Sequence, residues 1–132
     1  MIVVDASALI AIAAREPGFE ALLTILLSAD EAVIAPANYV EAGVILVRRG
    51  FVDNRSGYDQ WLARLGVTLD EHASMGEAAL SAYLAFGKGI HPAGLNLGDV
   101  FAYALAKSLD APLLYKGDDF VRTDIRSALQ PT

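Results

Sequence analysis

Five acidic residues stand at the junctions between the regular elements that this sequence predicts, and they are the residues best suited to do chemistry. They are Asp5, Glu41, Asp99, Asp118 and Asp119. Three of them, Asp5, Asp118 and Asp119, follow short apolar runs typical of buried strands. The other two fall in the first turns of predicted helices. Carboxylates crowded together raise one another's pKa unless a cation lies between them. Hard divalent cations with oxygen ligands, Mg²⁺ or Mn²⁺, are the natural partners of such a group.

Each acid, taken singly, also has a purely structural interpretation. Asp5 could cap the first helix, and Asp99 suits the positive end of a helix macrodipole. Glu41 could lie on a solvated helix face, while Asp118 and Asp119 are typical of a turn. What favours a common site is that all of them stand at junctions between strands and helices. Spacing alone leaves the structural and functional interpretations evenly matched.

The elements that must position these acids alternate along the chain. Strands are predicted over Ile2–Val4, residues 32–35, Val67–Leu69 and residues 112–115. Helices are predicted over residues 7–15, Phe19–Ser28, residues 38–49, residues 56–65, a stretch that begins at Asp70 or His72 and ends at Phe86, and residues 97–109. A short final element is predicted over residues 124–129.

Strands that are apolar on both faces and separated by helices predict an α/β fold. Its core is a short parallel sheet with helices on both faces, and its crossovers are right-handed. Ligands of such sheets bind beyond the carboxyl ends of the strands. The acids that follow the strands therefore meet at one edge, and the helix that carries Asp99 can begin beside them.

Length and composition limit the class of protein. A chain of 132 residues fits a single domain over residues 1–132. The absence of cysteine excludes disulfides, zinc ribbons, iron–sulfur clusters and thiol nucleophiles, and the lack of a histidine cluster argues against zinc. No apolar run approaches the roughly 18 residues of a membrane span. The chain enters its first strand without a basic leader, so we expect no signal peptide and a reducing, cytoplasmic location.

Charge and hydrophobicity bear on partners. A net charge of −6 argues against loose, non-specific binding of nucleic acid, although an acidic metal site in a nuclease can itself supply negative charge. A hydrophobic content of 55% in a small chain favours a subunit interface.

Four segments carry the acids together with characteristic neighbours. Asp5 lies in MIVVDASAL and Glu41 lies in NYVEA. Asp99 lies in LNLGDVFAYALAK, and Asp118 and Asp119 lie in PLLYKGDDF. In this order and spacing, over essentially the whole chain, they resemble the PIN-domain ribonucleases, and most closely the VapC toxins of type II toxin–antitoxin pairs. One such motif alone would be weak, whereas four in order are specific.

The resemblance implies a PIN fold and Mg²⁺-dependent hydrolysis of RNA by an activated water molecule, with Mn²⁺ as a substitute ion. It carries over Asp5, Asp99 and Glu41 as metal ligands and catalytic acids. The fourth acid is Asp118 or Asp119, because Gly117 stands where many relatives have an acid. Hydrogen-bonding residues around the acids, by the same resemblance, are Ser7, Asn96 and Thr123.

The same resemblance implies an RNA substrate, a homodimer and silencing by a cognate VapB-type antitoxin. We expect dimer and antitoxin contacts on the first two helices and on residues 41–47. Basic residues that could contact RNA phosphates, provided they cluster near the acids, are Arg15, Arg48, Arg49, Lys88, Lys116, Arg122 and Arg126.

Two other classes remain open at this point. A phospho-acceptor receiver or a haloacid-dehalogenase-type phosphatase also places acids at strand ends and binds Mg²⁺. The receiver, however, expects adjacent acids after its first strand, and the phosphatase expects an acid at position 7, where this chain has Ser7. An inactive PIN-like interaction module is the other alternative, and the intact acids speak against it.

Overall fold

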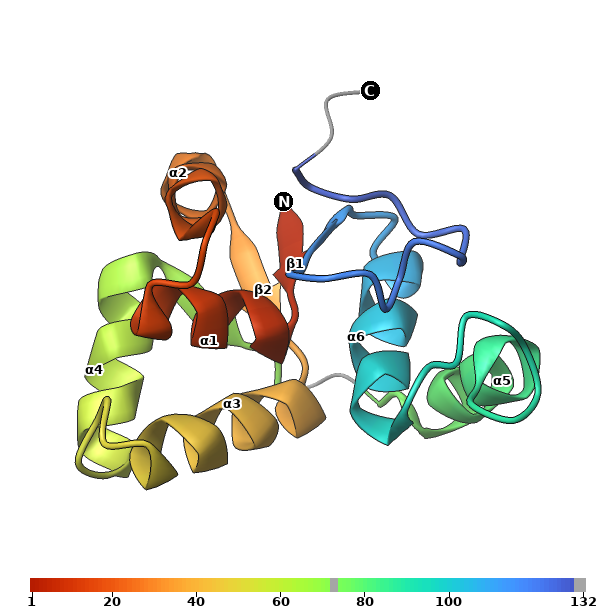
Figure 1. The fold of residues 1–132 in the computed structure, drawn as a ribbon, viewed down its shortest axis with the longest axis horizontal. Coiled ribbons are helices and arrows are strands. Elements are labelled where there is room, and N and C mark those ends of the chain that lie inside the picture. Colours follow the sequence, from red (N-terminus) through yellow and green to blue (C-terminus); the bar gives the residue numbers. More distant parts are fainter. Residues whose placement is uncertain (72–73, 130–132) are drawn as a thin grey trace.

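A central parallel sheet organises the computed structural model, which describes residues 1–71 and 74–129 (Figure 1). Its strands are β1 (Ile2–Val4), β2 (Ala32–Ile34), β3 (Val67–Leu69) and β4 (Leu113–Leu114). The order across the sheet is β3-β2-β1-β4, and all neighbouring strands run parallel. In the central strand, Val3 is paired with Val33 on one side and with Leu113 on the other.

The helices of the described residues are α1 (Ala6–Ala14), α2 (Phe19–Ser28), α3 (Pro36–Arg48), α4 (Arg55–Leu65), α5 (Gly76–Phe86) and α6 (Leu97–Ser108). In this part of the chain, no helix combines the length and the apolar character needed to cross a membrane.

Two apolar cores cover the two faces of the sheet. Ile2 and Val4 pack into a core shared with α1, α2, α3 and α4, whereas Val3 between them packs into a core shared with α5 and α6. This alternation is the ordinary geometry of a strand whose successive side chains point to opposite faces. Figure 1 shows α1, α2 and α4 to one side of the strands and α5 and α6 to the other. The predicted α/β fold with a two-sided parallel sheet is confirmed.

Helix α3 begins two residues before its predicted start at Asn38, because Pro36 occupies the first helical position. Proline suits that position, since the first backbone amides of a helix have no partner within it. From the sequence alone, Pro36 indicates only the end of the preceding strand.

The predicted start of the helix ending at Phe86 is wrong. Asp70 donates its backbone N–H to Ile34 O at 3.0 Å and so continues the pairing of β3 with β2. Helix α5 begins only at Gly76. His72, the alternative start, lies outside the described residues.

Residues 124–129 were predicted as a short element and form a single bridge to the sheet instead. Leu113 pairs with Ser127 in parallel fashion. Its backbone N–H donates to Arg126 O at 2.8 Å, and Ala128 N–H donates to Leu113 O at 2.9 Å. The end of the described chain is thereby attached to the free side of β4.

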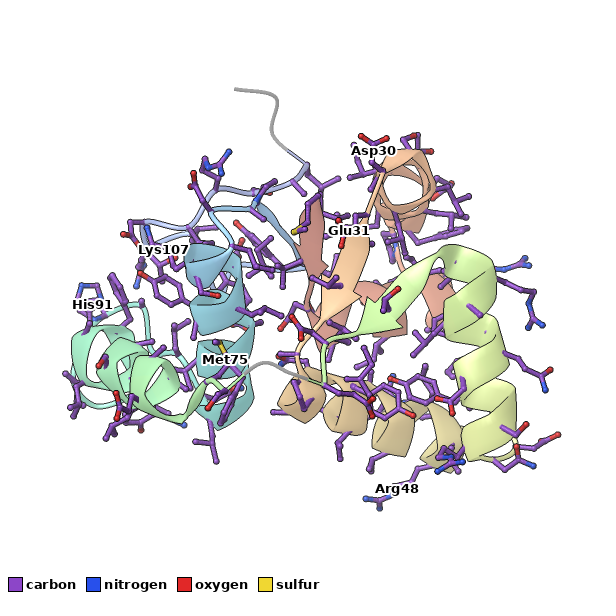
Figure 2. The ribbon with its side chains drawn as sticks, turned by 180° about the vertical axis from the view of Figure 1, so that it is seen from behind. Asp30, Glu31, Arg48, Met75, His91 and Lys107 are labelled. Atoms are coloured by element: carbon purple, nitrogen blue, oxygen red, sulfur yellow. The ribbon has the colours of Figure 1, made fainter. Side chains whose placement is uncertain are left out.

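The carboxyl ends of β1, β2 and β4 meet at one edge of the sheet, and the first turns of α1, α3 and α6 gather beside that edge (Figure 1). Asp30 and Glu31 precede β2 and lie at the opposite edge (Figure 2). The fold therefore separates the acids that follow strands from those that precede them.

Candidate functional site

Asp5 connects β1 to α1 and is almost completely buried, with 4% of its surface exposed. Its backbone N–H donates to Leu114 O at 2.9 Å, which joins it to β4. Its Oδ2 accepts a hydrogen bond from the backbone N–H of Ser7 at 3.1 Å and caps α1. Its Oδ1 is one of two buried side-chain polar atoms in the described residues that have no hydrogen-bond partner. The capping interpretation is therefore correct but accounts for only one carboxylate oxygen.

Asp99 lies in the first turn of α6, with 7% of its surface exposed. Asn96 caps this helix, since its Oδ1 accepts a hydrogen bond from Asp99 N–H at 2.9 Å. Asp99 Oδ2 in turn accepts from the backbone N–H of Asn96 at 3.0 Å. This reciprocal capping box satisfies two backbone donors and holds the Asp99 carboxylate in one orientation.

Glu41 reaches the same place from α3 and is half-buried. Its carboxylate lies against Gly98 in the first turn of α6. A Cβ atom built on Gly98 would lie 3.0 Å from Glu41 Oε1 and 3.1 Å from Oε2. A side chain at residue 98 would therefore crowd the carboxylate, which would have to shift by a few tenths of an ångström.

The segment after β4 brings the remaining acids to this edge. Lys116 donates its backbone N–H to Ser7 Oγ at 3.0 Å, which ties the segment to the start of α1. Gly117 then turns the chain with a φ of +96°, a conformation that favours glycine. Phe120, fully buried against Tyr115 with 5.0 Å between ring centres, anchors the far side. Asp119, immediately before this anchor, is itself exposed.

Electrostatic interactions join four of the five acids into one cluster. Burial, followed by the charges of Glu41 and Asp119, raises the pKa of Asp5 to about 6. Burial and the charges of Asp5 and Asp119 raise the pKa of Asp99 to about 6. Burial and the Asp99 charge raise the pKa of Glu41. We call Asp5, Glu41, Asp99 and Asp119 the acid cluster. Asp118 contributes to none of these shifts.

The three predicted hydrogen-bonding residues have different roles. Ser7 and Asn96 contact the site as described above. Thr123 donates its hydroxyl to Phe120 O at 2.7 Å and accepts from Ile125 N–H at 3.3 Å. It shapes the turn that follows Phe120 and, within the described residues, makes no hydrogen bond to an acid of the cluster.

The sequence patterns indicated neither the role of Asn38 nor the closeness of Gly98 to Glu41. Asn38 is fully buried and donates from Nδ2 to Gly98 O at 2.9 Å. The only available signal was that Asn38 precedes Glu41 by three residues, so both lie on one face of the predicted helix.

The acid cluster has no basic partner within residues 1–71 and 74–129. Ion pairs there join Arg55 to Asp59, Lys107 to Asp124 and Arg126 to Asp110. In the same ranges, no three acidic or histidine side chains lie so that they could share one metal ion. The cluster is thus a set of interacting charges rather than a closed ligand shell.

Two of the candidate phosphate contacts are engaged elsewhere. Arg126 pairs with Asp110, and Arg122 donates to Pro92 O at 3.2 Å. Arg48 extends from the carboxyl end of α3, away from the helix start that approaches the acids (Figure 2).

Comparisons with known proteins agree with one another. The PIN domain family matches residues 2–126. The VapC ribonuclease Mb0640 of Mycobacterium bovis is 39% identical over 130 residues, which cover 98% of this chain and 99% of that protein. Ribonuclease VapC of Mycolicibacterium smegmatis is 40% identical over 124 residues, 93% of this chain and 96% of that protein.

A solved structure shares the fold at much lower sequence similarity. The crystal structure of Mycobacterium tuberculosis VapC20, described as a sarcin-ricin loop cleaving toxin, matches with a TM-score of 0.71 and 17% identity. The match covers 95% of this chain and 96% of that one.

The burial of Asp5 predicts a specific dependence of stability on pH in the metal-free protein. Its pKa is about 6 when folded and returns toward 3.8 on unfolding. The folded state then binds more protons between these values, so the contribution of Asp5 to the free energy of unfolding falls as pH rises from about 4 to about 6. Asp5→Asn removes the buried charge and keeps a capping side chain.

We expect Asp5→Asn to be more stable than the wild type at pH 7.5 by roughly 1 to 3 kcal/mol, because one pKa unit corresponds to about 1.4 kcal/mol. The advantage should shrink at pH 4. Urea unfolding of both proteins in EDTA at the two pH values measures the difference, in which titrating groups that do not interact with Asp5 cancel. A difference that does not change with pH would contradict the assignment.

Proposed function

The chain belongs to the VapC ribonucleases of the PIN-domain family, and we propose that it hydrolyses RNA phosphodiester bonds with Mg²⁺ held by its acid cluster. Mn²⁺ is the expected substitute. The observation that carries the proposal is that four acids from separate segments interact at one sheet edge, where Asp5 Oδ1 is buried without a partner.

The chemistry of these residues fits a hard divalent cation. All the donors are carboxylate oxygens, the ligands that Mg²⁺ prefers. Asp5 and Asp99 each use Oδ2 for helix capping and keep Oδ1 for another partner. Capping fixes the orientation of both side chains in advance, as outer hydrogen bonds do for metal ligands generally. A bound cation would also offset the repulsion that holds the four carboxylates apart.

When bound, Mg²⁺ supplies polarisation of the phosphate and a more acidic water molecule for in-line attack. The chain's own residues do the rest. Asp5 and Asp99, each held at the start of a helix, would bind the ion and orient it. Glu41 has a raised pKa, which suits a general base near neutral pH. Asp119 is the exposed member of the cluster and the fourth acid. No covalent nucleophile is required.

Phosphotransfer alternatives gain no support from the site. Ser7 occupies the position where a phosphatase of the haloacid-dehalogenase type needs a second acid, and its hydroxyl is used by Lys116 N–H. An inactive interaction module would have no need of three buried or half-buried carboxylates that repel one another, because such a cluster costs stability.

Partners follow from charge and apolar surface. The acid cluster favours an antitoxin of the VapB type that inserts a basic side chain, which would compete with the metal. Among the described helices, two carry more than one large exposed apolar residue. These are Val40, Val44 and Val47 on α3, at 58%, 49% and 40% exposure, and Leu80 and Leu84 on α5, at 60% and 61%. We assign the α3 stripe to a second copy of this chain. A groove of about 420 Å³ between α3 and α4 adjoins that stripe.

Removing the charge of either buried aspartate should abolish cleavage without unfolding the protein. Asp5→Asn and Asp99→Asn preserve the size of the side chain and its capping hydrogen bonds. We expect cleavage of a labelled RNA in Mg²⁺ to fall by about 100-fold or more, the scale for losing one electrostatic group of an active site. EDTA should abolish wild-type cleavage and added Mg²⁺ should restore it.

Circular dichroism and thermal melting check that both variants fold. Growth arrest on expression of the wild type, relieved by Asp5→Asn, links the activity to toxicity. Near-full Mg²⁺-dependent cleavage by both variants would exclude the proposed role of the cluster.

Asp118 and Asp119 form a matched pair for the fourth acid. Only Asp119 interacts with Asp5 and Asp99. We therefore expect Asp119→Asn to lower kcat by about tenfold or more, whereas Asp118→Asn stays within about twofold of the wild type, as expected for an exposed residue outside the site. Initial rates of RNA cleavage decide between them, and the reverse order would assign the role to Asp118.

The proposed dimer is tested by a charge on α3. Val44→Asp places a carboxylate in the apolar stripe and should shift the mass in solution from dimer to monomer. Leu27→Asp is the matched control, because Leu27 is 59% exposed on α2, away from the stripe. Light scattering coupled to gel filtration measures both. Dissociation by Leu27→Asp alone would move the interface to α2.

A further inference from the structure

Asn38 is a completely buried amide in the first turn of α3, one turn before Glu41. A buried amide is costly unless its groups are hydrogen-bonded. Asn38 Nδ2 donates to Gly98 O at 2.9 Å, a contact between residues 60 positions apart. This bond joins the first turn of α3 to the first turn of α6, the two turns that approach the acid cluster.

The Asn38 side chain also acts on the Glu41 carboxylate, since hydrogen bonding from Asn38 lowers the Glu41 pKa that burial raises. The carboxylate in turn lies against Gly98, whose missing Cβ leaves space 3.0 Å from Oε1. Asn38, Glu41 and Gly98 therefore form a closed set of contacts. Because Asp99 is the next residue on α6, this set fixes the position of Glu41 relative to Asp99.

The orientation of the amide follows from its partners. Gly98 O and the Glu41 carboxylate are both acceptors, so both require the NH₂ group of Asn38. The opposite orientation would place Oδ1 against two acceptors. As it stands, Oδ1 is the second of the two buried side-chain polar atoms without a partner in the described residues, the first being Asp5 Oδ1. In this orientation Asn38 Oδ1 has no partner, and the NH₂ group faces Gly98 O and the Glu41 carboxylate.

We propose that Asn38 is a positioning residue for RNA cleavage, which holds the Glu41 carboxylate beside the first turn of α6 at a set distance from Asp99. The inference rests on the proposed role of Glu41 in the acid cluster. Asn38 acts through Glu41 and contacts neither substrate nor reacting atoms.

The test is a double-mutant cycle between Asn38 and Glu41. Asn38→Ala is made in the wild type and in Glu41→Gln, and kcat and KM for RNA cleavage are measured in Mg²⁺. We expect kcat to fall by about 10- to 100-fold in the wild type, the scale for partners that orient an active-site ligand, with a smaller change in KM. In Glu41→Gln, the same change should cost less than about twofold, because residues that act together are not additive.

A matched control separates positioning from general packing of α3. Tyr58 donates its hydroxyl to Tyr39 O at 2.7 Å, so Tyr58→Phe removes a hydrogen bond to α3 outside the acid cluster. Thermal melting is measured for every variant. We expect Tyr58→Phe to lower the melting temperature while kcat stays within about twofold of the wild type.

Gly98→Ala tests the position of Glu41 in a second way, which does not require Asn38→Ala to fold. Alanine is favoured over glycine in a helix, and the backbone carbonyl that Asn38 binds is retained. Its Cβ would nevertheless crowd Glu41. We expect kcat to fall without a fall in melting temperature. Mn²⁺ binding to the RNA-free protein, followed by electron paramagnetic resonance, should weaken in Asn38→Ala and in Gly98→Ala.

Equal losses of kcat from Asn38→Ala in both backgrounds, or unchanged kcat in Gly98→Ala, would overturn the inference. Failure of the proposed function gives a different result: wild-type cleavage that needs no divalent ion and wild-type protein that binds no Mn²⁺. The cycle between Asn38 and Glu41 can be measured in either case, because it depends on cleavage alone.

Discussion

Mutual repulsion between desolvated carboxylates is the constraint on which the rest of this structure depends. Asp5 and Asp99 are buried close enough to influence each other, and each has a pKa of about 6. Such a cluster destabilises the fold at neutral pH, so other parts of the chain must hold it in place. The two apolar cores on either side of the sheet provide that support. Their strands are short, but every residue of β1, β2 and β4 is buried.

The hydrogen bonds that hold the acids are ordinary helix caps, and each serves two purposes. Helix capping normally satisfies backbone amides, and here it also fixes the direction of a reactive side chain. Asp5 and Asp99 each use one carboxylate oxygen to cap, and the other oxygen of Asp5 is buried without a partner. Ser7 extends the arrangement, since its hydroxyl holds the segment that carries Asp119. Rigid placement by first-turn hydrogen bonds explains how a small domain can keep like charges together.

The sequence predicted the fold class and three acids of the cluster because their signals are local. Asp5, Glu41 and Asp99 each stand just beyond a boundary that apolar patterning marks. The choice between Asp118 and Asp119 was out of reach, because adjacent residues after a turn differ only in the direction of their side chains. Asn38 was missed because a neutral amide leaves no charge pattern, and its partner Gly98 lies 60 residues away. The start of α5 was misplaced because Asp70 resembles a helix cap but is used in strand pairing.

The parallel topology has a consequence for folding during synthesis. The acids of the cluster come from residues 5, 41, 99 and 119 of a chain of 132 residues. The central strand β1 is synthesised long before its neighbour β4, because Leu113 and Leu114 come far later in the chain than Ile2–Val4. Non-local pairing of this kind must wait for the distant partner. The acid cluster, and with it the proposed nuclease site, is therefore complete only after residue 119 has emerged from the ribosome.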